Sequence, residues 1–259
     1  MTPMIQGALG VASGSLVGFS LGLIGGGGSI LAVPLILFVV GVKNPHVAIG
    51  TSAVAVAASA AVNLANHAWQ GTVRWHCALV FAAAGVVGAF GGSSLGKIVD
   101  GDRLIFLFAL LMIAIGLLML RPRAELGIPA VTLTRGNLPA LLALGFASGA
   151  LAGFFGIGGG FLIVPGLMLA TGMPISDAIG SSLVAVTAFG LTTATNYAFS
   201  GLVDWRIAFL FLAGAVVGGA LGSRLYKSLS AKRGVLNKVF AALVFVVAIY
   251  MIYRTRSAM

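Results

Sequence analysis

Long apolar runs separate the charged residues of this chain and constrain its fold more than any other feature. Each run holds about 17–25 residues, which as a helix would cross a hydrocarbon layer about 30 Å thick. Only 8% of the 259 residues are charged, against roughly a quarter in soluble domains. A backbone in lipid must satisfy its own hydrogen bonds, and the sequence lacks the alternation of a transmembrane barrel. The pattern therefore predicts an all-α polytopic membrane protein that lies in the lipid bilayer.

The chain is strongly basic, with 15 Lys and Arg against five Asp and Glu. Nearly every basic residue falls at the end of an apolar segment or in a loop, as orientation signals and headgroup contacts require. No basic tract is interleaved with exposed aromatics, so we expect no nucleic-acid partner. The single cysteine, Cys77, excludes an intramolecular disulfide and a multi-cysteine metal site. The first apolar run lacks a basic leader and a cleavage site, which predicts a retained span.

A polar interval at residues 121–136 divides the chain into two sets of five apolar segments. We therefore predict a first transmembrane repeat at 1–120, a linker at 121–136 and a second transmembrane repeat at 137–259. The ten predicted segments fall at 4–24, 28–42, 46–69, 74–96, 103–120, 137–155, 160–171, 176–199, 204–226 and 235–253.

The two sets match in sequence at an offset of 130 residues. The stretch "AIGTS" at 48–52 pairs with "AIGSS" at 178–182, and Trp75 pairs with Trp205. Such landmarks in register indicate an internal duplication, which is common among membrane transporters. Because five segments per copy is an odd number, two copies that cross fully would be inverted, and the Lys and Arg distribution modestly supports this. The second segment of each copy reaches only about 18–22 Å as a helix, so re-entrant segments and parallel copies stay open.

Two glycine tracts precede the short segments and are the first candidates for a binding site. They read "GGGGSILAVP" at 25–34 and "GIGGGFLIVP" at 156–165. An unwound backbone within a membrane is tolerated where protein buries it or where it lines a cavity. A helix that begins there would point free N–H groups and its positive end at an anion. Alternatively, the glycines serve helix packing alone. The candidate binding residues are Gly25, Gly27, Gly28, Ser29, Gly156, Gly158, Gly159 and Gly160.

Matched hydroxyls and amides complete the candidate site. Thr51 and Ser52 follow a glycine just inside the third segment, as do Ser181 and Ser182 in the eighth. Hydroxyls can donate to an oxyanion, and we expect both pairs to meet the glycine tracts near the midplane. The alternative for each is a hydrogen bond to the preceding turn. Two further amides, Asn66 and Asn196, are candidates for lining a vestibule.

The acidic residues and histidines argue against several function classes. All five carboxylates fall in loops or at segment ends, whereas carriers coupled to H⁺ or Na⁺ usually hold an acid within a span. The three histidines, at 46, 67 and 76, have no acids close to them in the sequence, and no nucleophile is paired with a base. The glycine tracts lack the context of nucleotide loops. We therefore expect no enzyme activity, no cofactor and no metal site.

With these motifs the chain resembles the TauE/SafE family, the sulfite exporter or 4-toluene sulfonate uptake permease group. The likeness covers nearly the whole chain and rests on the duplicated order of the glycine tracts, the "AIGTS" and "AIGSS" stretches, and the turns that end in Trp75 and Trp205. It implies a multi-pass permease of the bacterial inner membrane for small sulfur-containing anions. The first tract departs from the pattern, with Gly26 and Ser29 where the second has Ile157 and Gly160.

Together these observations predict a secondary transporter for sulfite, sulfoacetate or other organosulfonates. Transport would proceed by alternating access of the two repeats around a midplane anion site. An anion-selective channel and a non-transporting membrane scaffold are the alternatives. Direction, coupling ion and oligomeric state stay open at this stage, a homodimer included.

Overall fold

The computed structural model describes residues 2–24, 26–120, 131–229 and 233–256. Every regular element within these ranges is helical, which confirms the predicted all-α class. The expected linker falls largely on residues 121–130, which lie outside the described residues, so the division into two repeats stays a prediction. The elements are α1 (Pro3–Ile24), η1 (Gly26–Leu31), α2 (Ala32–Pro34), η2 (Leu35–Val39), α3 (Pro45–Trp69), α4 (Trp75–Ile98), α5 (Gly101–Leu120), α6 (Leu138–Phe155), α7 (Gly160–Thr171), α8 (Ile175–Phe199), α9 (Trp205–Leu229) and α10 (Arg233–Arg256).

Six of the described helices are long and apolar enough to cross a membrane. The six candidate spans are Pro3–Gly22, Pro45–Trp69, Trp75–Ile98, Leu138–Phe155, Ile175–Phe199 and Trp205–Gly222. Large apolar side chains remain exposed along them, such as Leu79 at 54% and Val217 at 59%. Apolar side chains that face outward are expected where the surrounding solvent is lipid.

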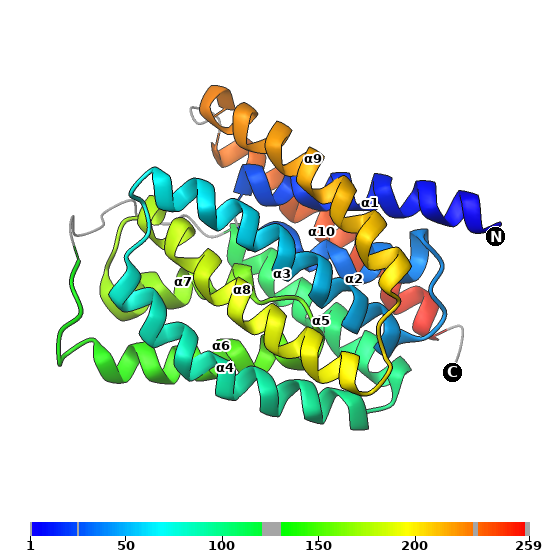
Figure 1. Cartoon of the computed structure of the whole chain (residues 1–259), viewed down its shortest axis with the longest axis horizontal. Coiled ribbons are helices and arrows are strands. Elements are labelled where there is room, and N and C mark those ends of the chain that lie inside the picture. Colours follow the sequence, from blue (N-terminus) through cyan, green and yellow to red (C-terminus); the bar gives the residue numbers. More distant parts are fainter. Residues whose placement is uncertain (1, 25, 121–130, 230–232, 257–259) are drawn as a thin grey trace.

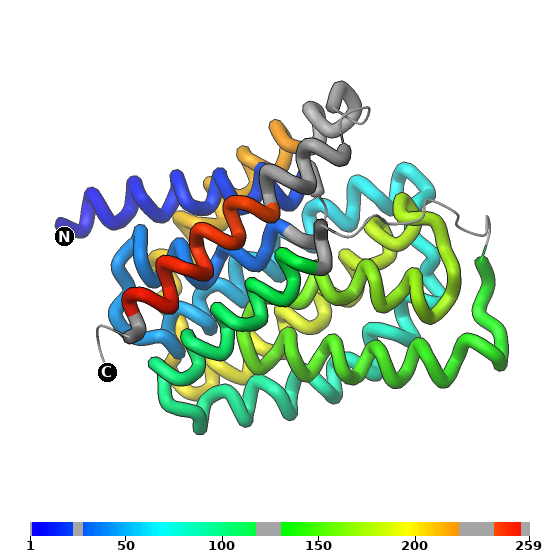
Figure 2. Tube along the Cα trace, turned by 180° about the vertical axis from the view of Figure 1, so that it is seen from behind, coloured from blue at the N-terminus to red at the C-terminus, as the bar shows by residue number. Residues whose placement is uncertain are grey.

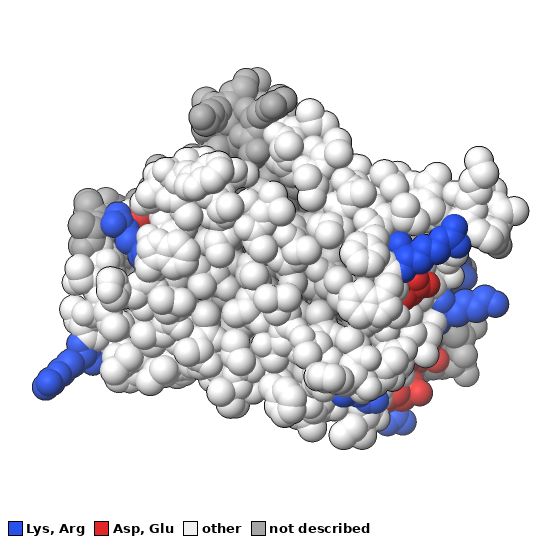
Figure 3. All heavy atoms as spheres, in the orientation of Figure 1, with Lys and Arg blue, Asp and Glu red and all other residues white. Residues whose placement is uncertain are grey.

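Charged side chains gather at the two ends of the long axis, and the broad face between them carries none in the view of Figure 3. The start of α1 and the end of α10 lie at the same end of the molecule (Figures 1 and 2). We call this end the α8–α9 face, after the turn at 200–204, and the opposite end the α3–α4 face, after the turn at 70–74. The uncharged band between the two faces is the part that lipid can surround.

The short second segments do not form regular spanning helices. After the first tract the chain passes from the 3₁₀ helix η1 through the single turn α2 into the π-helical turn η2. Pro34 ends α2, and a proline disrupts the hydrogen bonding of the preceding turn. The second segment of the other half is α7, whose 12 residues span about 18 Å as a helix. Both segments are therefore too short to cross the hydrocarbon layer.

The helices pair across the two halves of the chain. The contacting pairs are α1 with α9, α4 with α6, α3 with α8, and α5 with α10. The first helix of each half thus packs against the fourth helix of the other half. The helices of the third and fifth segments each pack against the matching helix of the other half. The start of α3 lies at the α8–α9 turn, through Thr51 and Asp204, and the start of α8 lies at the α3–α4 turn, through Ser181 and Arg74. The antiparallel crossing of α3 and α8 supports the inverted duplication, which stays a prediction.

Several glycines outside the two tracts serve close helix packing. A Cβ placed on Gly92 of α4 would overlap the backbone of Ala150 in α6, and one on Gly18 of α1 would overlap Ala215 in α9. Small residues let membrane helices approach closely and gain van der Waals contact. For these positions the packing explanation of glycine is sufficient.

Candidate functional site

The second glycine tract breaks the chain between α6 and α7. Gly156, Gly158 and Gly159 have φ values of 67°, 64° and 69°, in the left-handed region that residues with a Cβ rarely adopt. The tract reverses the chain direction and begins α7 at Gly160. A Cβ on Gly158 would lie 2.9 Å from Val56 Cγ1 and 3.1 Å from Val186 Cγ1. Glycine is therefore required here both by the backbone conformation and by the close approach.

Several backbone N–H groups at the start of α7 lack a backbone acceptor in the described chain. Ile157 N–H donates to the Ala152 carbonyl at 3.2 Å, and Leu162 N–H donates to the Gly159 carbonyl at 2.9 Å. Between them, the N–H groups of Gly158, Gly159, Gly160 and Phe161 make no backbone hydrogen bond within the described part of the chain. All four residues are buried. Free N–H groups at a helix start, together with the positive end of the helix dipole, form an arrangement that suits an anion.

The tract lies in the middle of the bundle. Val56 and Val186, which flank Gly158, are close to the midpoints of the 25-residue helices α3 and α8. These two valines occupy matching positions in the two halves at the offset of 130 residues. The structure thus places the second tract at the level where the candidate site was expected.

The first tract has a different conformation. Gly25 lies outside the described residues, and Gly27 is described only as part of the 3₁₀ helix η1. Gly28 and Ser29 are buried, and Gly28 packs against the backbone of α1 at Ser20 and Leu21. η1 contacts α1, α7 and α8, so the two tracts lie in the same part of the bundle. Their geometries differ nonetheless. Among the described glycines of the two tracts, those with a left-handed backbone conformation are all in the second tract.

Thr51 and Ser181 make matching hydrogen bonds to the opposite half. Thr51 Oγ1 accepts from the backbone N–H of Asp204 at 2.9 Å, just before α9. Ser181 Oγ accepts from the backbone N–H of Arg74 at 2.8 Å, just before α4. Each hydroxyl therefore satisfies an N–H group at a helix start, which stabilises that helix. In the described conformation these two side chains hold helix ends together across the two halves.

The structure does not bring the two hydroxyl pairs to one point. Because α3 and α8 cross in antiparallel directions, Thr51 lies toward the α8–α9 face and Ser181 toward the α3–α4 face. Each lies about 8 Å along its helix from the level of the tract. The sequence left inverted and parallel copies open, so it did not settle whether the two hydroxyl pairs meet or separate.

The second hydroxyl of each pair bonds to its own helix. Ser52 Oγ donates to the Ile49 carbonyl at 2.8 Å and also lies 3.2 Å from the Gly156 carbonyl oxygen. Ser182 Oγ donates to the Ile179 carbonyl at 2.8 Å. Ser52 thus links α3 of the first half to the glycine tract of the second half. The candidate site is built from both halves of the chain.

Asn196 bridges two helices at the α8–α9 face. Its Oδ1 accepts from Lys97 Nζ at 2.7 Å, and its Nδ2 donates to Ser93 Oγ at 2.6 Å and to Ser94 Oγ at 3.0 Å. Lys97 lies in the last turn of α4, and Asn196 lies near the end of α8. A cation is stabilised where the negative ends of two helices meet. The matched Asn66 is exposed near the end of α3, so the two amides differ in their surroundings.

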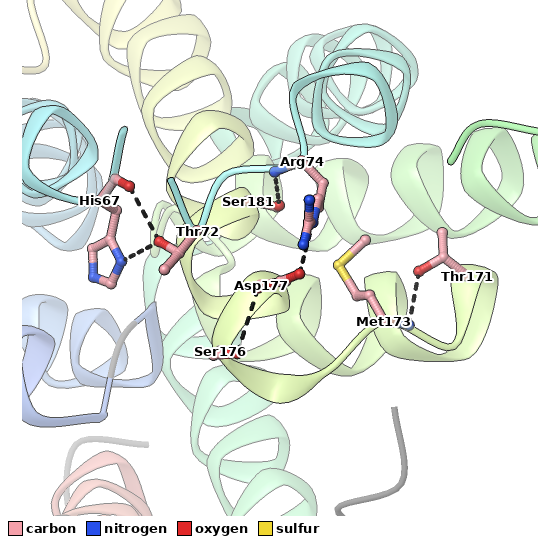
Figure 4. Close-up of polar contacts among 8 residues, drawn as sticks. All are labelled: His67, Thr72, Arg74, Thr171, Met173, Ser176, Asp177 and Ser181. Atoms are coloured by element: carbon pink, nitrogen blue, oxygen red, sulfur yellow. Dashed lines mark hydrogen bonds and ion pairs between the residues drawn. The ribbon is translucent and has the colours of Figure 1, made fainter. Parts of the chain in front are cut away.

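An ion pair that the sequence did not predict lies at the α3–α4 face. Arg74 Nε donates to Asp177 Oδ2 at 2.7 Å, and the Asp177 side chain is only 12% exposed (Figure 4). Beside it, Thr72 Oγ1 lies 2.9 Å from His67 Nδ1. No sequence signal connects two residues so far apart in the chain, and only the packing of α8 against the α3–α4 turn joins them.

The chain's family follows from the comparison with known proteins. Residues 10–251 match the sequence model described as sulfite exporter TauE/SafE. The chain belongs to this family. A probable membrane transporter protein of Xylella fastidiosa (strain 9a5c) is 56% identical over 248 residues, which cover 95% of this chain and 94% of the relative. The probable membrane transporter protein YunE of Bacillus subtilis (strain 168) is 29% identical over 245 residues, which cover 86% and 89%.

The match extends to a probable membrane transporter protein, MJ0441, of Methanocaldococcus jannaschii, which is 26% identical over 258 residues covering 92% of this chain and 93% of the relative. No solved structure matches the chain. With six described helices that can span a membrane, this TauE/SafE protein is a multi-pass membrane transporter, and a location in the bacterial inner membrane is consistent with these findings. Within the described residues, no group of three or more His, Cys, Asp and Glu could hold a metal ion.

Proposed function

We propose that this TauE/SafE protein carries small sulfur-containing anions, such as sulfite, sulfoacetate or other organosulfonates. The observation that carries the proposal is the set of four buried N–H groups at residues 158–161, in the middle of the bundle and without backbone acceptors in the described chain. An oxyanion offers several acceptors that fit such a set of donors. The substrate would bind where α7 begins, between α3 and α8.

The distribution of carboxylates supports an anion rather than a cation as the substrate. The described acids, Asp100, Asp102, Asp177 and Asp204, all lie in loops or in the first turn of a helix. The flanking side chains at the level of the tract are the valines at 56 and 186. An anion there would meet N–H donors and the positive end of α7, with no carboxylate of the described chain to repel it.

We propose alternating access as the mechanism, with α3 and α8 as the elements that separate at either face. The hydrogen bond from Asp204 N–H to Thr51 closes the α8–α9 face, and the one from Arg74 N–H to Ser181 closes the α3–α4 face. At the α3–α4 face the Arg74–Asp177 ion pair adds a second connection. The position that matches Asp177 holds Val47, so this ion pair has no counterpart at the other face. Opening one face at a time would expose the tract alternately to the two sides of the membrane.

Uptake of labelled sulfite and sulfoacetate by purified protein in liposomes tests the proposal. We expect saturable uptake that Gly158→Leu abolishes, because the larger side chain would collide with Val56 and Val186. Gly91→Leu is the matched control, since Gly91 lies on α4 with nothing within 4 Å of an added Cβ. Equal uptake by wild type and Gly158→Leu would refute the proposed site.

The same liposomes separate the alternatives. Counterflow of labelled substrate indicates a carrier, whereas ohmic single-channel currents would indicate an anion-selective channel. A scaffold without transport activity would show no uptake, and no anion would raise its melting temperature, because a ligand that binds the folded state must stabilise it.

A further inference from the structure

Ser59 on α3 has a buried hydroxyl without a hydrogen-bond partner among the described residues. Its side chain is 2% exposed. Hydroxyls in helices normally donate to a carbonyl of the preceding turn, and Ser20, Thr187 and Thr192 do so here at 2.7–2.9 Å. A buried polar group that remains unpaired costs free energy and calls for an explanation, such as a ligand that pairs with it.

Ser59 lies on the face of α3 that meets the second glycine tract. Residues 52, 56 and 59 follow one another at spacings of four and three, which places them on one face of a helix. Ser52 Oγ lies 3.2 Å from the Gly156 carbonyl oxygen, and Val56 flanks Gly158. Ser59 is the next residue along this face, about one turn from the level of the tract.

The same face of α3 continues with a polar residue, Asn63. Its Nδ2 donates to the Ser59 carbonyl at 3.0 Å. The Asn63 amide also faces α9, because a Cβ on Gly219 would lie 3.7 Å from Nδ2. Asn63 is partly exposed, whereas Ser59 is buried. The two side chains thus extend a line of polar groups from the tract toward the α3–α4 face.

The matching face of α8 is blocked by an aromatic ring. At the offset of 130 residues, Phe189 stands where α3 has Ser59. Phe189 is fully buried, stacks on Phe81 at 6.4 Å between ring centroids, and occupies the space that a Cβ on Gly85 would need. Thr193, one turn further along α8, also has an unpaired buried hydroxyl. It is separated from the level of the tract by Phe189.

We propose that Ser59 and Asn63 form an oxyanion subsite beside the second tract, while Phe189 closes the equivalent position on α8. This inference rests on the proposed function, because the occupant is the transported oxyanion. The Ser59 hydroxyl and the Asn63 amide donate to its oxygens after the anion leaves the N–H groups of residues 158–161. Both are neutral donors, which bind an anion weakly enough for it to move on. The two halves of the chain therefore contribute unequally to the pathway.

Sulfite uptake into liposomes by Ser59→Ala tests the subsite, with Thr193→Val as the matched control. Both changes remove a buried, unpaired hydroxyl, so their effects on packing are similar. We expect Ser59→Ala to raise the KM for sulfite by about ten-fold to a hundred-fold, as for the loss of a hydrogen bond to a charged group. Ser59→Thr, which retains the hydroxyl, should restore most of the affinity. Thr193→Val should stay within about two-fold of wild type, since that change is below 0.5 kcal/mol.

Wild-type kinetics in Ser59→Ala, or equal losses in Ser59→Ala and Thr193→Val, would overturn the subsite and leave the proposed function intact. Absence of sulfite and sulfoacetate uptake by the wild type would instead overturn the proposed function, and the subsite with it.

Discussion

Replacement of Gly158 by alanine separates the two reasons for a glycine in the second tract. Gly158 has a φ of 64° and two valine methyl groups within 3.1 Å of an added Cβ. Gly201, in the α8–α9 turn, has a φ of 68° but nothing within 4 Å of an added Cβ. The left-handed conformation costs a residue with a Cβ about 1–2 kcal/mol. Gly201→Ala should therefore show the conformational cost alone.

Gly158→Ala adds crowding to the same conformational cost. Val56 Cγ1 and Val186 Cγ1 would have to move, because 2.9 Å and 3.1 Å are shorter than ordinary carbon contacts. Insertion of a methyl group into a packed core costs about 1–3 kcal/mol, so the total should reach about 2–5 kcal/mol. Any gain from a stiffer unfolded chain is the same for both variants and cancels in the comparison.

Unfolding of both variants in mixed micelles with increasing dodecyl sulfate, followed by circular dichroism, measures the difference. We expect Gly158→Ala to lose at least 1 kcal/mol more than Gly201→Ala, as the crowding estimate requires. Gly158→Ala should also lose sulfite uptake, which Gly201→Ala should retain. Equal stability of the two variants would refute the reasoning, because it would mean that α3 and α8 leave room for a side chain at the tract.

Three further predictions concern contacts away from the tract. Arg74→Met should destabilise the protein by about 1–3 kcal/mol, which lies between the stability contributions of exposed and buried ion pairs. A double-mutant cycle with Asp177→Asn should show the coupling of the two residues, and additive losses would contradict a direct ion pair. Thr51→Val and Ser181→Ala should each cost about 0.5–2 kcal/mol as lost helix caps, and thermal melts should show additive losses because the two caps lie at opposite faces. Cys77 is 1% exposed, so mass spectrometry should find it unmodified by maleimide until dodecyl sulfate unfolds the protein; rapid labelling of the folded state would show that α4 is packed differently.

Much of the site's position could be predicted from the sequence, but little of its internal geometry. The second tract was expected before a short helix near the midplane; in the structure it precedes the 12-residue helix α7 and lies beside the middles of α3 and α8. The length of an apolar run and a run of glycines depend mainly on local backbone properties, so the sequence alone could predict this much. Thr51 and Ser181 were expected beside the anion, yet in this conformation they accept hydrogen bonds from N–H groups at the starts of α9 and α4. A hydroxyl's partner depends on what lies across from it, which no local pattern contains.

The membrane-spanning helical class, the ten segments and the two glycine tracts were determined by the sequence itself. The length of an apolar run decides whether a helix can span the bilayer, and a glycine run decides where the backbone can leave the helical conformation. Neither property depends on which helices pack beside the segment. Only the tertiary structure decided that α3 and α8 cross in antiparallel directions and that Arg74 forms an ion pair with Asp177. It also decided that the buried Ser59 hydroxyl has no hydrogen-bond partner in the described chain. These features arise from contacts between segments distant in the sequence, because side chains of such segments meet only when helices pack.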